Sequence, residues 1–114
     1  MIEQLAQEFG RRRFAFVDEA ELQLAIEAML LECGQTYARE VVLSPRDRVD
    51  FMLGNTALEV KIKGSQPAVL EQLERYANSD QVSAIVLVTS RFQLRAMPPE
   101  INGKPVSVIY LPRL

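Results

Sequence analysis

The chain has 114 residues, of which 48% are hydrophobic and 25% are charged, and its formal net charge is −2 at pH 7. This size allows one domain with one core, and the composition is ordinary for a globular chain without a membrane-spanning run. Histidine is absent, which excludes Ser-His-Asp and Cys-His nucleophilic sites and histidine-ligated zinc, and no Gly-rich phosphate loop occurs.

Residues 1–17 are expected to be a lead-in to the domain. They contain the basic run Arg11-Arg12-Arg13. One interpretation of this run is a solvated, flexible segment, and the other is an arm that grips phosphate groups. The N-terminal residues lack the basic start and apolar centre of a secretory signal, and the single Cys33 cannot form an intrachain disulfide. We therefore expect a cytoplasmic protein.

The segment from Asp18 to about Cys33 is predicted to be a helix. Its apolar residues recur at helical spacing: Leu22, Ile26, Met29, Leu30 and Cys33. Asp18 suits the N-cap and Gly34 suits the stop. On this pattern Cys33 is a small core residue. Glu19 falls on the core-facing stripe, whereas Glu21 lies about 200° round the helix and should be more solvated.

Three short strands are predicted next. Residues 41–43 form the first, and residues 49–53 and 57–63 form a hairpin that turns at Gly54-Asn55. Each arm of the hairpin carries an acid among hydrophobic neighbours, Asp50 in the first and Glu59 in the second. Because strand side chains alternate, Glu59 and Lys61 project from one face. Buried carboxylates are costly unless a cation or hydrogen bonds compensate them.

The rest of the chain is predicted to alternate helix and strand. Pro67 suits the first turn of a helix that ends near Asn78. The apolar run 84–88 is typical of a strand covered on both faces, 92–104 is loop-rich, and 106–111 is a last strand. These elements predict an α/β fold with a central mixed sheet of about five strands flanked by two helices.

Three motifs together resemble the PD-(D/E)XK nuclease superfamily. Asp50 followed across a hairpin by Glu59-Val60-Lys61 is the central pattern. Gln72-Leu-Glu-Arg-Tyr76 is similar to the Gln-xxx-Tyr element of RecB-type nucleases, and the helix that starts at Glu19 is similar to the acid-bearing first helix of the VRR-NUC branch. The resemblance covers residues 18–90 in the order helix, hairpin, helix, strand, and it implies a restriction-endonuclease-like core. One departure is that Pro45, and not the residue before Asp50, is the nearest preceding proline.

The expected chemistry is that of carboxylates, a metal and a lysine. Carboxylate oxygens suit Mg²⁺ or Mn²⁺, which neutralises the charge of a phosphodiester under attack and activates water. Asp50 and Glu59 are the predicted ligands, and the resemblance adds the carbonyl of Val60 and the acid Glu19, either as a direct ligand or in the outer shell. Lys61 would orient or deprotonate the water, or stabilise charge on the phosphate. The plainer alternatives are a surface Glu–Lys pair in the hairpin and, for Glu19, an acid favoured by the helix dipole.

Further residues are predicted to contact DNA. By resemblance, Gln72 would reach the site and the DNA backbone while Tyr76 packs beside it; the alternative is a surface glutamine beside a core tyrosine. Lys63 lies on the same strand face as Lys61 and is expected to touch phosphate. Arg48 and Arg91 are the remaining candidates for DNA contact.

The resemblance implies metal-dependent hydrolysis of phosphodiester bonds in DNA, and selectivity for DNA structure is a further expectation from it. A domain of this size has little room for a separate recognition module, so we expect a homodimer without membrane association. The sequence leaves open whether cleavage is internal or from an end. The alternative function is an inactive module that kept the fold and binds nucleic acid or a protein partner. The net charge of −2 favours this alternative, and the intact Asp50, Glu59 and Lys61 favour the nuclease.

Overall fold

The computed structural model describes residues 2–113, which form three α-helices, one 3₁₀ helix and six strands. The helices are α1 (Ile2–Gly10), α2 (Glu19–Glu32) and α3 (Gln66–Ala77), and the 3₁₀ helix is η1 (Phe92–Arg95). The strands are β1 (Ala38–Ser44), β2 (Asp47–Leu53), β3 (Thr56–Lys61), β4 (Ala84–Thr89), β5 (Glu100–Ile101) and β6 (Lys104–Tyr110). No helix in this part of the chain is long and apolar enough to cross a membrane.

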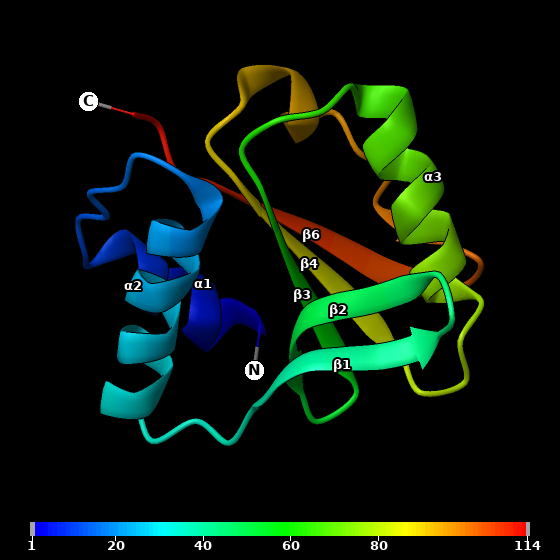
Figure 1. Cartoon of the computed structure of the whole chain (residues 1–114), viewed down its shortest axis with the longest axis horizontal. Helices are drawn as coiled ribbons and strands as arrows, with labels where there is room; N and C mark the ends of the chain where they lie inside the picture. The colour runs from blue at the N-terminus through cyan, green and yellow to red at the C-terminus, as the bar shows by residue number, and fades with distance from the viewer. Residues whose placement is uncertain (1, 114) are drawn as a thin grey trace.

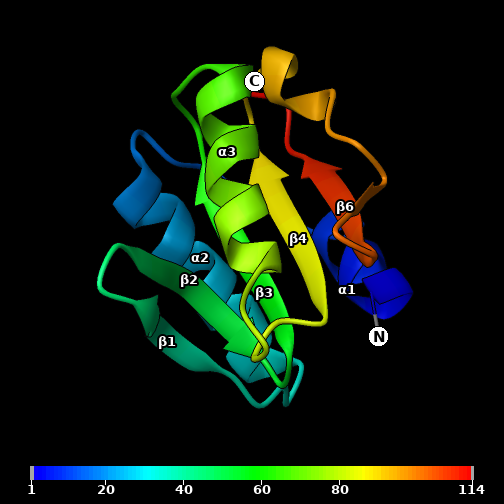
Figure 2. The same cartoon turned by 90° about the vertical axis from the view of Figure 1, so that its right-hand side faces the viewer.

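One mixed sheet lies between two layers of helix, with α1 and α2 on one face and α3 on the other (Figure 1, Figure 2). The strand order is β1-β2-β3-β4-β6-β5. β1, β2 and β3 are antiparallel neighbours, whereas β4 runs parallel to both β3 and β6. Every residue of β4 is buried, as the continuous apolar run predicts. The α/β prediction is therefore confirmed.

The sheet divides the core into two apolar clusters. On the α3 side, residues of the sheet pack against the helix through Val69, Leu73, Tyr76 and Ala77. On the other side, α2 contributes Leu22, Ile26, Met29 and Leu30, and α1 contributes Leu5 and Phe9. Alternation along β3 explains the division, because Ala57 belongs to the first cluster while Leu58 and Val60 belong to the second. Glu59 and Lys61 share the parity of Ala57, so they belong to the α3 side.

The N-terminal segment, which was expected only as a lead-in to the domain, contains helix α1 and contributes to the core. Leu5 and Phe9 are one helical turn apart, so they share a face, and their exposed fractions are only 3% and 2%. The flexible interpretation of the arginine run is also wrong for Arg12, which is half-buried and donates hydrogen bonds to Glu32 at 2.6 Å and Glu8 at 3.5 Å. Helix α1 has nine residues and buries only Leu5 and Phe9, so its apolar pattern is too short to indicate a helix by periodicity.

The counts of five strands and two helices were also wrong, since the described residues form six strands and three helices. Besides α1, the addition is β5, which pairs with the start of β6 across a turn at Asn102-Gly103. Both turn residues have positive φ, 52° and 76°, which is the conformation of a tight two-residue hairpin. The predicted loop thus contains a strand of only two residues, too short to show a period.

Cys33 is exposed, so its prediction as a core residue was wrong. It occupies the C-cap of α2, where the chain leaves the helix. Gly34 follows with φ of 69°, and the N–H groups of Gly34 and Gln35 bond to the carbonyls of Leu31 and Leu30. This left-handed stop confirms Gly34 as the end of the helix. Cys33 itself keeps a right-handed backbone, with φ of −80° and ψ of −4°, and still donates to the Met29 carbonyl, so it stays on the end of the helix but outside the buried cluster.

Candidate active site

The central feature of the candidate site is the point where β2 and β3 stop pairing. Their register runs from Leu53–Thr56, beside the turn at Gly54, to Phe51–Leu58. Asp50 and Glu59 occupy the next position in the same register. Gly54 has φ of 62°, so the predicted Gly54-Asn55 turn is confirmed. The turn sets the register, and the register brings the two acids side by side although nine residues separate them.

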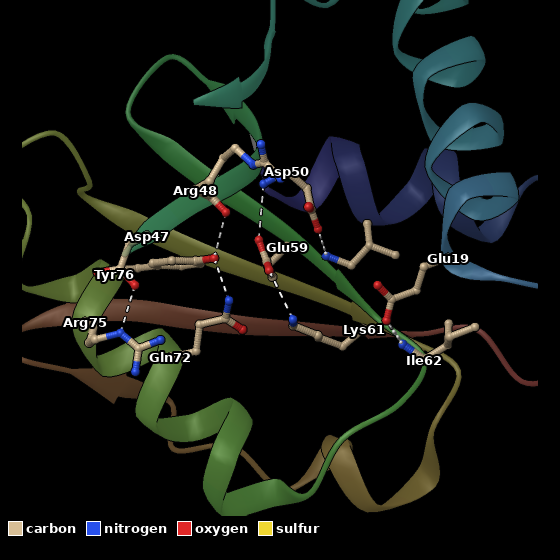
Figure 3. Close-up of polar contacts among 11 residues, drawn as sticks. Glu19, Asp47, Arg48, Asp50, Glu59, Lys61, Ile62, Gln72, Arg75 and Tyr76 are labelled. Carbon is tan, nitrogen blue, oxygen red and sulfur yellow. Dashed lines mark hydrogen bonds and ion pairs between the residues drawn. The ribbon is translucent and has the colours of Figure 1, made fainter. Parts of the chain in front are cut away.

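At this position each acid binds a backbone N–H from the other strand. Asp50 Oδ2 accepts a hydrogen bond from the Val60 N–H at 2.8 Å, and Glu59 Oε1 accepts one from the Asp50 N–H at 3.2 Å (Figure 3). The side chains thus replace the ladder bonds that the diverging strands no longer make. Because buried N–H groups are costly to leave unpaired, this arrangement fixes both carboxylates in place.

Lys61 completes a trio with the two acids. Its Nζ lies 3.5 Å from Glu59 Oε2, and the two side chains are 25% and 3% exposed. Figure 3 shows Lys61 extending from β3 toward Glu59, with Asp50 on the neighbouring strand. The Lys61 side chain is therefore partly accessible to solvent, whereas that of Glu59 is not. This geometry places a cationic group between solvent and a buried carboxylate.

Burial makes the second negative charge of this site unfavourable. Burial and the adjacent charge of Asp50 raise the pKa of Glu59 to about 8, although Lys61 and the Asp50 N–H counteract the rise. Burial also raises the pKa of Asp50, against the opposing effects of the Val60 N–H and Lys61. The two carboxylates have only the Lys61 ammonium to balance their charge. A hard divalent cation would bind their oxygens and favour the ionised form of both acids.

Helix α3 contributes a hydrogen-bonded pair to the same region. Tyr76 is fully buried, and its hydroxyl donates to the Arg48 carbonyl at 3.0 Å while accepting from Gln72 Nε2 at 2.9 Å. Burial and the charge of Glu59 raise the pKa of the Tyr76 phenol, so it remains protonated. Gln72 is half-buried and lies between Tyr76 and the Lys61 side of the site (Figure 3). The Gln72–Tyr76 pair therefore faces the carboxylates from one helical turn of α3.

Glu19 lies at the edge of the site. Its Oε1 accepts a hydrogen bond from the Ile62 N–H at 2.9 Å, directly after Lys61. Its negative charge also contributes, after burial, to the raised pKa of Asp50. Glu21 is exposed and accepts instead from the Val17 N–H at 3.1 Å. Of the two helix-borne acids, Glu19 is thus the one that faces the site.

The structure brings the other predicted residues together only in part. The Val60 side chain is fully buried in the opposite cluster, so only its backbone faces Asp50 and Glu59. Lys63 and Arg91 are exposed beyond the ends of β3 and β4. The Arg48 side chain is 65% exposed and lies 3.8 Å from Glu40. These side chains border the site without contacting its acids.

Asp47 and Arg75 were not predicted as part of this region. Asp47 is 8% exposed, and its Oδ1 accepts a hydrogen bond from Arg75 Nε at 2.8 Å. This contact ties the start of β2 to α3, one residue before Tyr76 in the helix (Figure 3). No local signal in the sequence marked this pair, since Asp47 precedes the predicted strand 49–53 and its partner is 28 positions away. We interpret the pair as positioning Gln72 and Tyr76 over the acids.

Within residues 2–113, no three acids, cysteines or histidines form a group that could hold a metal ion. The site therefore provides two closely placed carboxylates, from Asp50 and Glu59, with Glu19 bound to the backbone nearby. A two-carboxylate site is compatible with Mg²⁺, which commonly binds one or two carboxylates and keeps several waters. Comparisons with protein-family models, with curated proteins and with solved structures found no match for this chain.

Proposed function

We propose that this protein hydrolyses phosphodiester bonds in DNA, using a divalent metal ion bound by Asp50 and Glu59. The observation that carries the proposal is the pair of acids where β2 and β3 stop pairing, half-buried Asp50 and buried Glu59, with Lys61 Nζ 3.5 Å from Glu59. The order of elements around it supports a restriction-endonuclease-like core, because α2, the β2–β3 hairpin, α3 and β4 follow the predicted order of helix, hairpin, helix, strand.

The donor set suits Mg²⁺ or Mn²⁺, with Asp50 and Glu59 as ligands, the Val60 carbonyl as a third and Glu19 in the outer shell. When bound, such an ion supplies positive charge for the phosphate and acidifies water. The chain's own contribution is to hold the carboxylates. The Val60 and Asp50 N–H groups orient them, and burial shields the Glu59 side chain from bulk water.

Lys61 is the residue that would act on the reacting groups. Its ammonium lies beside Glu59 and its side chain is 25% exposed, so it can approach a phosphate oxygen or the attacking water. A fixed cation stabilises the negative charge that develops on the phosphate during attack. Gln72, held by Tyr76, would position the DNA backbone, and Lys63, Arg48 and Arg91 would bind flanking phosphates. We further expect a homodimer that acts in the cytoplasm.

The alternative function, a catalytically inactive module that binds nucleic acid or a protein partner, is favoured by one observation. Both acids already satisfy backbone N–H groups, so the hairpin is complete as a structural unit without a metal. A binding module would tolerate Asp50→Asn and Glu59→Gln, since an amide oxygen can accept the same hydrogen bonds. A nuclease would not, because a neutral amide binds a divalent cation poorly.

The deciding experiment is cleavage of labelled single-stranded, duplex, flap and four-way-junction DNA with Mg²⁺, Mn²⁺ or EDTA. Asp50→Asn, Glu59→Gln and Lys61→Met are each expected to lower the cleavage rate by at least about 100-fold. The matched control is Glu74→Gln, an exposed acid of α3 that touches neither carboxylate. Absence of cutting by the wild type on every substrate, or equal cutting by Glu59→Gln, would reject hydrolysis at this site.

A further inference from the structure

A second cluster of side chains lies close to the candidate active site and has no part in the chemistry described above. The Arg95 guanidinium carbon lies 3.7 Å from the centre of the Phe92 ring and 5.2 Å from that of Tyr110. The two rings meet edge to face, with centres 6.5 Å apart and an interplanar angle of 82°. Phe92 is 61% exposed. Two aromatic rings and a planar cation are therefore gathered at the surface.

The sheet register connects this cluster to Lys61. Lys61 pairs with Thr89 on β4, and Thr89 pairs with Tyr110 on β6. Paired residues of parallel strands point to one face, so Tyr110 lies on the α3 side, as Lys61 does. Neighbouring strands are about 4.8 Å apart, which places the two backbones roughly 10 Å apart. The 3₁₀ helix η1 contacts α3, β4 and β6, so Phe92 and Arg95 belong to the same end of the sheet (Figure 1).

The chain segments around this end are basic although the whole chain is acidic. Residues 60–70 contain Lys61 and Lys63 and no acid, and residues 81–99 contain Arg91 and Arg95 and no acid. The net charge of these two segments is therefore +4, against −2 for all 114 residues. These segments flank the acids Asp50 and Glu59, so positive charge that attracts a polyanion borders the carboxylate site.

The cluster has features that a purely structural role does not require. The core beneath η1 is closed by Leu94, which is fully buried, so Phe92 is not needed to cover it. Arg95 lies against the Phe92 ring, yet most of the Phe92 side chain is open to solvent. Exposed aromatic rings beside arginines stack with unpaired nucleobases in proteins that bind single strands, whereas bases inside a continuous duplex are already stacked.

We propose that Phe92, Arg95 and Tyr110 form a stacking surface for unpaired bases of a DNA strand whose backbone passes Asp50, Glu59 and Lys61. This inference rests on the proposed function and specifies its substrate. The preferred DNA has unpaired bases close to the cleaved phosphate, as single strands and flaps do. Continuous duplex is the poorer substrate, because its bases must be unstacked before they reach the rings.

Binding measurements in EDTA test the surface without cleavage. The probe is a single-stranded oligonucleotide containing 2-aminopurine, whose fluorescence falls when the base stacks, and a duplex of the same sequence is the comparison. Phe92→Leu keeps an apolar side chain but removes the ring. It is expected to weaken single-strand binding about 5- to 150-fold and to abolish the fluorescence change, while duplex binding changes less than about twofold.

Three further samples separate stacking from charge and from loss of folding. Arg95→Lys keeps the positive charge, so the salt dependence of binding should persist while single-strand affinity falls. Leu24→Ala removes a side chain of α2 that is 63% exposed, on the opposite face of the sheet, and should bind both DNAs normally. An oligonucleotide with an abasic position in place of the 2-aminopurine should bind wild type and Phe92→Leu equally.

The outcomes distinguish this inference from the proposed hydrolysis. Equal single-strand binding by wild type and Phe92→Leu, or equal loss of single-strand and duplex binding, would refute the stacking surface even if the wild type cleaves DNA. If the wild type cleaves no DNA but Phe92→Leu loses single-strand binding selectively, hydrolysis is rejected and the stacking surface stands. When DNA is cut, the preference for flap over duplex should shrink in Phe92→Leu.

Discussion

At the scale of single residues, Glu59 couples the stability of the fold to the state of the site. An unfolded glutamate has its ordinary pKa of 4.5, whereas burial and the charge of Asp50 raise the pKa of folded Glu59 to about 8. The folded state therefore holds a proton that the unfolded state releases. Its contribution to stability is complete below about pH 4.5 and is lost as the pH rises through about 8.

This loss of stability with rising pH gives a prediction for Glu59→Gln in metal-free buffer. The variant cannot ionise at this position, so its stability relative to the wild type should increase steadily from pH 5 to pH 8. Urea denaturation in EDTA across this range measures the difference, and Glu74→Gln, at an exposed position, should show none. A difference that is constant with pH would mean that Glu59 does not titrate in this window.

At the scale of elements, the Asp47–Arg75 contact holds α3 against the hairpin that carries the acids. Burial alone would raise the pKa of Asp47, but hydrogen bonds from Arg75 and Ser44 outweigh it and lower the pKa. The ionised form therefore favours the folded state. This contribution is present above the unfolded value of about 3.8 and is lost as the pH falls.

Asp47→Asn should lower the free energy of unfolding by about 1 kcal/mol at pH 7, because it removes a charged hydrogen-bond acceptor. The loss should shrink at pH 3, where the wild-type carboxyl also begins to be protonated. Chemical denaturation at the two pH values gives the comparison. Glu71→Gln is a close control, because Glu71 also lies 3.6 Å from Arg75 but its side chain is 72% exposed. This variant should change the free energy of unfolding by less than about 0.5 kcal/mol.

The elements that could be predicted are those whose signals are local. Gly54-Asn55 predicted the hairpin turn, the unbroken apolar run 84–88 predicted the buried strand, and Asp18 and Gly34 predicted the ends of α2. Helix α1 and strand β5 were missed because they are short and owe their form to contacts with distant residues. Helix periodicity wrongly placed Cys33 in the core, because the residue is the C-cap at the end of α2, beyond the last residues that the helix buries.

In the candidate site, too, only the features that follow from local patterns could be predicted. Alternation along one strand placed Glu59 and Lys61 on one face, and the helical spacing of Gln72 and Tyr76 placed them one turn apart. The exchange of backbone bonds between Asp50 and Glu59 could not be predicted, because it depends on where two strands diverge. The Asp47–Arg75 contact likewise depends on the packing of α3 against β2, which no local pattern encodes.

At the scale of the whole molecule, α1 completes the second half of the core. Leu5 and Phe9 lie in the same cluster as the buried face of α2, and Phe9 also meets Phe14, with ring centres 5.3 Å apart. The hairpin and α3 form the candidate site on the other side of the sheet. The first ten residues are therefore expected to matter for stability and not for chemistry.

Phe9→Ala should lower the free energy of unfolding by about 3–5 kcal/mol, since a fully buried aromatic ring is replaced by a cavity. Urea denaturation measures the loss, and Gln7→Ala, an exposed position of the same helix, should change it by less than about 0.5 kcal/mol. Metal-dependent activity of Phe9→Ala, assayed where the variant is still folded, should equal that of the wild type. A selective loss of activity would instead connect α1 to the site.

The crossed hydrogen bonds of Asp50 and Glu59 have a spectroscopic consequence. The protons on the Val60 and Asp50 nitrogens point at the two carboxylates, so their chemical shifts depend on the charge those oxygens carry. Two backbone resonances thus serve as built-in indicators of the site. In a ¹⁵N-labelled sample, titration with Mg²⁺ should move these two signals first and together, before any nucleic acid is added.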